Sequence, residues 1–129
     1  MPIVVGYVPT KEGRAALSRA VEECKLRKTS LVLVNSSRGG RGLPPSELES
    51  EMEQLVADLR ADGLAVDTRT FVRGLEPAED LIAVAEEIDA DFIVIGLRRR
   101  TPVGKLILGS NAQRILLDAP CPVLAVKGD

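Results

Sequence analysis

The segment from Gly96 to Ser110 carries the residue types that hold a phosphate group. It has a glycine near each end, three consecutive arginines at 98–100 and a lysine at 105. An apolar run over 92–95 precedes it and a helical pattern over 112–117 follows, so the segment leads from a strand to a helix start. Backbone N–H groups and the positive end of a helix favour an anion there, and arginines pair bidentately with phosphate oxygens. We expect the phosphate side of a site to comprise Gly96, Arg98, Arg99, Gly109, Ser110 and Asn111.

Two ordinary explanations of these residues stay open. A water-exposed basic turn accounts for the arginines, and a helix N-cap accounts for Ser110, without any ligand. Other phosphate motifs are excluded. Lys105 is followed by Leu106 rather than Ser or Thr, and no glycine stands five positions before Gly104, so this is not a Walker A loop. No G-x-G-x-x-G pattern follows the first apolar run.

The composition indicates one aliphatic domain over 1–129. Of the 129 residues 45% are apolar, and the aromatic residues are one tyrosine and two phenylalanines, which suits strands buried on both faces. The net charge of −2 and the few aromatics argue against a nucleic-acid-binding surface. The absence of histidine excludes imidazole triads and imidazole metal ligands, and Cys24 and Cys121 fit no metal motif. Because no signal peptide or long apolar run is present, we expect a cytoplasmic protein that does not bind membranes.

Apolar runs and helical periodicity alternate along the chain. We expect strands at 3–8, 31–34, 64–72, 92–95 and 123–126, and helices at about 10–28, 44–61, 77–88 and 110–118. This alternation predicts an α/β fold with a five-stranded parallel sheet, helices on both faces and the strand order 3-2-1-4-5. In such a sheet ligands bind beyond the carboxyl ends of the first and fourth strands. The segment from Gly96 to Ser110 follows the fourth strand.

The stretch from Asp91 to Lys127 closely resembles the carboxyl-terminal half of the universal stress protein family. The sequence DAPCPVLAV at 118–126 is nearly a signature of that family, and residues 12–17 and 74–82 resemble the starts of its first and third helices. The resemblance covers the whole chain. It implies a flavodoxin-like fold, a dimer and, in one branch, ATP held in the crevice.

Two positions depart from the pattern of the ATP-binding branch. That branch has a glycine, two residues, a second glycine, nine residues, and then Gly-Ser or Gly-Thr. Gly96 and the Gly109-Ser110 pair match, but Arg99 stands at the second glycine. The branch also carries an aspartate at the end of the first strand, where this chain has Val8. These two residues favour the family branch that binds no nucleotide.

The leading hypothesis is a dimeric sensor or regulatory module that binds ATP, ADP or AMP, with or without Mg²⁺. The base and ribose side would comprise Gly6, Tyr7, Val8 and Ser36. The alternative is a dimeric stress or interaction protein of the same family that binds no nucleotide. The chain has no histidine and no acidic residue between Asp91 and Asp118, so we expect at most weak ATP hydrolysis. The apolar edge strand Val123–Val126 is expected to pair with its copy in a homodimer.

Overall fold

The sheet of this protein is parallel throughout and has the order β3-β2-β1-β4-β5. The computed structural model describes residues 1–8, 10–36, 45–71, 77–97 and 109–128. Within these ranges the elements follow one another as β1 (Ile3–Gly6), α1 (Lys11–Arg27), β2 (Leu31–Ser36), α2 (Pro45–Ala61), β3 (Val66–Phe71), α3 (Pro77–Glu87), β4 (Phe92–Leu97), α4 (Ser110–Asp118) and β5 (Val123–Lys127). The expected fold class and strand order are confirmed.

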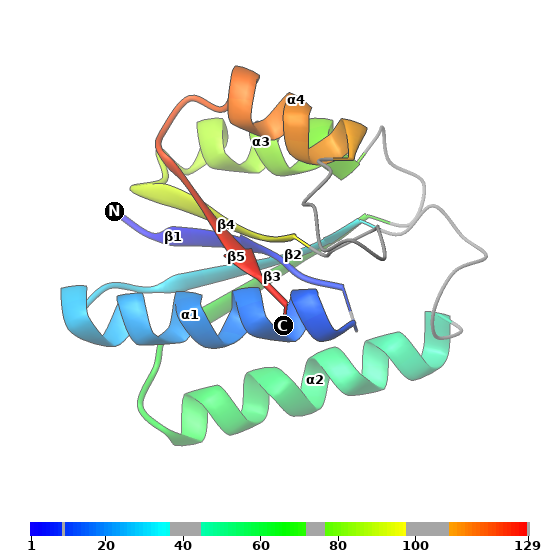
Figure 1. Ribbon diagram of the computed structural model, residues 1–129. Helices are drawn as coiled ribbons and strands as arrows, with labels where there is room; N and C mark the ends of the chain where they lie inside the picture. The colour runs from blue at the N-terminus through cyan, green and yellow to red at the C-terminus, as the bar shows by residue number, and fades with distance from the viewer. Residues whose placement is uncertain (9, 37–44, 72–76, 98–108, 129) are drawn as a thin grey trace.

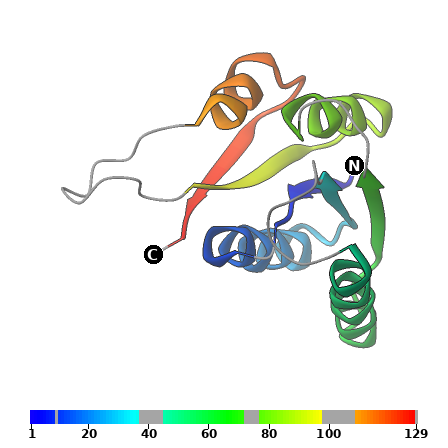
Figure 2. The same cartoon turned by 90° about the vertical axis from the view of Figure 1, so that its right-hand side faces the viewer.

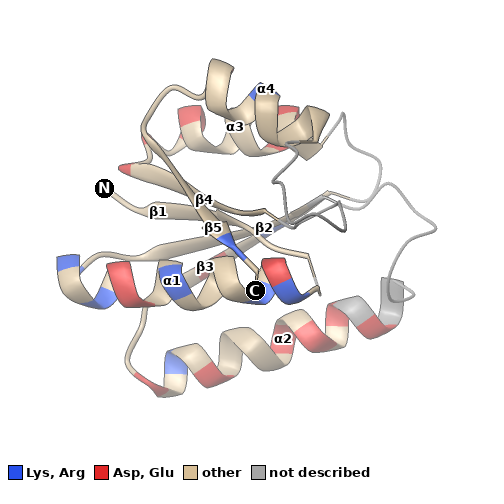
Figure 3. Ribbon diagram, in the orientation of Figure 1, with Lys and Arg blue, Asp and Glu red and all other residues tan. Residues whose placement is uncertain are grey.

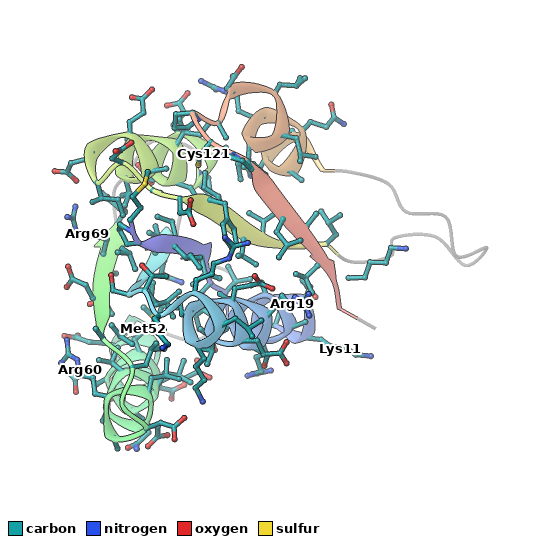
Figure 4. The ribbon with its side chains drawn as sticks, turned by 90° about the vertical axis from the view of Figure 1, so that its left-hand side faces the viewer. Lys11, Arg19, Met52, Arg60, Arg69 and Cys121 are labelled. Atoms are coloured by element: carbon teal, nitrogen blue, oxygen red, sulfur yellow. The ribbon has the colours of Figure 1, made fainter. Side chains whose placement is uncertain are left out.

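Helices cover both faces of the sheet, α1 and α2 on one and α3 and α4 on the other (Figure 1; Figure 2). Successive side chains of a strand point to opposite faces, so β1 contributes Ile3 and Val5 to the core under α1 and α2, and Val4 to the other core. Met52 of α2 lies in the first of these cores (Figure 4). Because both faces are covered, the central strands β1 and β4 consist of uncharged residues (Figure 3).

The ends of the helices are set by local chemistry. Thr10 is the N-cap of α1, and its hydroxyl accepts a hydrogen bond from the N–H of Gly13 at 3.2 Å. Lys28, with φ of 55°, closes the same helix in the left-handed conformation. Gly63, with φ of 90°, turns the chain after α2. Pro77 is the first residue of α3, as its fixed φ predicts.

The carboxyl ends of β1 and β4, where ligands bind, differ from the sequence-based expectation. β1 ends at Gly6 rather than Val8, whereas β4 extends beyond Ile95 to Leu97. The extension arises because β5 continues the ladder, pairing Val126 with Gly96. Gly96 therefore belongs to a strand, which corrects the prediction that it opens a loop.

Candidate functional site

A pocket of about 160 Å³ lies at the carboxyl ends of β1 and β4. This is the point of a 3-2-1-4-5 sheet where the strand order reverses, and where open α/β sheets bind ligands. Most of the lining side chains are apolar. The described lining residues are Gly6, Tyr7, Val8, Glu12, Gly13, Val34, Pro77, Leu81, Ile95, Gly96, Asn111, Ala112 and Ile115.

Three helices begin at this pocket, because every helix of a parallel sheet starts where the preceding strand ends. The first turns of α1, α3 and α4 supply lining residues, Gly13, Pro77 and Ala112 among them. The start of α1 is capped by the Thr10 hydroxyl and carries an acidic residue in its first turn. The start of α3 has two acidic residues in its first turn. Both positive helix ends are thus partly compensated by the protein itself.

The start of α4 is different. Its N-cap is Gly109, which provides no side-chain hydrogen bond, and its first turn contains no acidic residue. Ser110 is the first residue of the helix and Gly109 is the N-cap, so the alternative explanation of Ser110 as an N-cap is wrong. Among the described residues, no capping side chain or first-turn acidic residue compensates the start of α4, and its N–H groups and positive dipole end favour an anion at this edge of the pocket.

Asn111 fixes the start of α4 against the start of α3. Its side-chain oxygen accepts a hydrogen bond from the N–H of Ala78 at 3.3 Å. The residue was expected on the phosphate side of the site, and it does line the pocket. The oxygen of its amide is engaged by α3, which leaves the amide NH₂ as the group with donors for a ligand.

Gly96 brings β4 into close contact with α1. A Cβ atom at Gly96 would overlap the carbonyl oxygen of Glu12, so no larger residue fits without a shift of the helix. The residue was expected on the phosphate side of the site. The structure adds a packing requirement, because the space beside Gly96 is occupied by the first turn of α1.

Val8 forms an apolar part of the pocket rim. It is 42% exposed, and its carbonyl oxygen occupies the space that a Cβ of Gly13 would need. The same carbonyl accepts a hydrogen bond from the N–H of Thr10 at 2.8 Å. The side chain of Val8 can therefore make apolar contacts with a ligand, but it cannot form a hydrogen bond with one.

A polar cluster lies behind the pocket on the face covered by α1 and α2. Burial and the nearby carboxylate of Glu51 raise the pKa of Tyr7, while Arg14 opposes them. Asn35, which is 2% exposed, donates a hydrogen bond to the carbonyl of Tyr7 at 2.9 Å. Burial thus favours the neutral phenol of Tyr7, and the hydrogen bond from Asn35 holds the end of β1 against β2.

The structure brings about half of the expected site residues together. Gly6, Tyr7, Val8, Gly96 and Asn111 line the pocket, whereas Gly109 and Ser110 precede the lining residues of α4. Ser36 ends β2, and its part in binding stays a prediction. Arg98 and Arg99 lie outside the described residues. Sequence reasoning selected Tyr7 and Val8 but not Glu12 or the other apolar lining residues. The available signal for these was their position beside strand ends or helix starts in the predicted topology.

The chain matches the model of the universal stress protein family over residues 1–127. It is 43% identical, over 97% of its length, to a universal stress protein of Mycolicibacterium smegmatis, 96% of which is covered. This chain belongs to the universal stress protein family.

Solved universal stress proteins share the fold. One from Archaeoglobus fulgidus is 36% identical, with a TM-score of 0.80 and 98% coverage of both chains. A universal stress protein of the same organism, solved in complex with dAMP, is 31% identical, with a TM-score of 0.73 and 98% coverage of both chains. A structural relative at this level of identity thus holds an adenine nucleotide.

Among the described residues, His, Cys, Asp and Glu side chains do not gather in any group of three or more that would hold a metal ion. The described helices include none with the length and apolar character needed to cross a membrane.

Proposed function

We propose that this universal stress protein binds an adenine nucleotide in the pocket between β1 and β4. The proposal is carried by one observation. An apolar pocket at the reversal of strand order lies beside the start of α4, a helix start without a capping side chain or first-turn acidic residue among the described residues. The Archaeoglobus fulgidus relative solved with dAMP supports the same ligand class.

The two parts of the site suit the two parts of a nucleotide. The apolar lining, which includes Leu81, Ile95 and Ile115, accommodates the flat base. The volume of about 160 Å³ is below the ~300 Å³ at which pockets hold a whole drug-sized ligand, so it takes the base side only. The phosphates then extend toward the start of α4, with Arg98 and Arg99 preceding it in the sequence. ATP would bring Mg²⁺ coordinated mainly by its own phosphates.

The direct test is isothermal titration calorimetry on protein that has been unfolded, freed of bound ligand and refolded. We expect saturable heat with ATP, ADP or AMP. An absence of heat with all three at millimolar concentration rejects the proposal.

The competing function is a dimeric stress or interaction protein that binds no nucleotide. The apolar side chain of Val8 at the pocket rim favours it, because no acceptor is offered to a base or sugar there. Gly109→Val distinguishes the two functions. It places a branched side chain at the start of α4, and we expect it to abolish nucleotide retention under the first function and to change little under the second.

A further inference from the structure

Glu12 is the charged residue of the pocket lining within the part of the chain that the structure describes. It lies in the first turn of α1 and is half-buried. Its carboxylate forms no ion pair or hydrogen bond with any other described residue. A carboxylate at the rim of an apolar pocket can accept hydrogen bonds from a ligand and disfavours a second negative charge beside it.

The position of Glu12 is fixed by two strands. Its carbonyl oxygen packs against Gly96 of β4, and its Cα lies where a Cβ of Gly128 would approach to 2.5 Å. Gly128 is held in turn by a hydrogen bond of 3.0 Å from its N–H to the carbonyl of Leu97. The first turn of α1 accordingly lies beside the end of β5 in the ribbon views (Figure 1; Figure 3). The carboxylate is therefore carried by a backbone that packing holds in place.

A nucleotide has a donor-rich part and an anionic part, and the pocket has a matching asymmetry. Glu12 belongs to the α1 side of the pocket, and the start of α4, which has no capping side chain or first-turn acidic residue among the described residues, belongs to the other side. An anion at Glu12 would meet a like charge, whereas sugar hydroxyls or the base amine would meet an acceptor. Carboxylates recognise ribose hydroxyls in this way in other nucleotide-binding α/β folds.

We propose that Glu12 selects and orients the ligand by accepting hydrogen bonds from the donors of the nucleoside, a sugar hydroxyl or the base amine. The inference rests on the proposed function. Glu12 of α1 would thereby provide the hydrogen-bond acceptor for the nucleoside that the side chain of Val8 lacks. It also predicts that the phosphate end is turned toward α4.

The experiment compares Glu12→Gln and Glu12→Ala with the wild type by calorimetry. The ligands are AMP, dAMP, which lacks the 2′-hydroxyl, and IMP, which lacks the base amine, each with and without Mg²⁺. We expect the wild type to prefer AMP over dAMP or IMP by roughly tenfold or more, because the net contribution of a hydrogen bond to a charged group corresponds to about that ratio. Glu12→Ala should remove this preference and Glu12→Gln should reduce it. Both variants should bind ATP more tightly relative to AMP.

Glu47→Gln is the matched control. Glu47 is an exposed acidic residue in the first turn of α2 and is not a lining residue, so the variant removes a first-turn charge without changing the pocket. It should retain the ligand preferences of the wild type. Melting temperatures of all variants show whether the fold is kept.

The outcomes separate the two proposals. Unchanged preferences in both Glu12 variants, with normal AMP binding by the wild type, overturn the role of Glu12 and leave the proposed function intact. An effect of the Glu12 variants that is seen only with Mg²⁺ also overturns the proposed role, because the carboxylate would then bind the metal ion rather than the nucleoside. Wild type that binds none of the nucleotides overturns the proposed function itself.

Discussion

Single glycines set the geometry of the pocket rim. Gly13 makes room for the carbonyl of Val8, Gly96 for the carbonyl of Glu12, and Gly128 for the Cα of Glu12. In each case the neighbour is backbone or lies close to it, so it cannot move aside as the end of a flexible side chain does. The rim is therefore assembled from backbone contacts that require the missing Cβ.

Gly96→Ala tests the packing role of Gly96. The added methyl group overlaps the carbonyl of Glu12, and we expect the free energy of unfolding to fall by about 1–3 kcal/mol in urea denaturation. Gly6→Ala is the control at the same end of the sheet. There the methyl group would lie 3.2 Å from Cδ2 of Leu81, a flexible side chain, and we expect a smaller loss. Equal stability of Gly96→Ala and the wild type would show that α1 does not depend on this contact.

Cys24 gives the fold a dependence on alkaline pH. Burial, with a smaller effect of Glu23, raises the pKa of its thiol to about 11, so the folded state holds the proton more tightly than the unfolded state. The resulting stability is complete below the ordinary thiol pKa, near 9, and is lost as the pH rises toward 11. The free energy of unfolding should therefore fall between pH 8.5 and pH 10.5. The fall should be smaller in Cys24→Ala, and identical slopes would contradict the assignment.

The helices and strands could be predicted from the sequence. The residues that line the pocket could not, because they depend on where these elements end and which of them are in contact. Alternating apolar runs and helical stripes predicted the sheet, because strands buried on both faces leave a continuous apolar signature. They did not predict that β4 continues through Gly96, since that extension depends on pairing with Val126 of β5. Glu12 was likewise not recognised, because its place in the pocket follows from the packing of α1 against β4 and β5. Arg98 and Arg99 lie outside the described residues.

The start of α4 allows a test in which stability and binding change in opposite directions. Gly109 has φ of −71° and ψ of 166°, which any residue adopts, and it provides no capping side chain. Gly109→Asp and Gly109→Asn should each stabilise the protein by about a few tenths of a kcal/mol, because both side chains cap a helix better than glycine. Only Asp adds a negative charge where the phosphates are proposed to bind. We expect Gly109→Asp to weaken ATP binding more than Gly109→Asn in calorimetry. Equal affinities of the two variants would show that the phosphates do not bind at the start of α4.

At the scale of the whole molecule, the two edges of the sheet differ. The edge strand β3 carries polar residues at 67–70, and Asp67 and Thr70 on its two faces are exposed, as is usual for a strand that faces water. The opposite edge strand, β5, is Val-Leu-Ala-Val-Lys, and three of its apolar residues are only partly buried. Val123, Leu124 and Val126 pack against the two cores from this edge. An apolar edge of this kind favours pairing with a second strand.

We propose that two copies pair along β5 about a two-fold axis, which would cover this edge in both. Ala125→Arg tests the arrangement, because Ala125 is the exposed apolar residue in the middle of β5 and the substitution brings like charges together across the axis. We expect sedimentation velocity to show the wild type at twice the 13.8 kDa mass of the chain and the variant as monomer. Ala83→Arg, at an exposed position of α3, should remain dimeric.

Because Gly128 follows β5 and packs against Glu12, a dimer at this edge would also stabilise the rim of the pocket. Nucleotide affinity should then fall in Ala125→Arg together with dimerisation, and a variant that stays dimeric would exclude β5 as the interface.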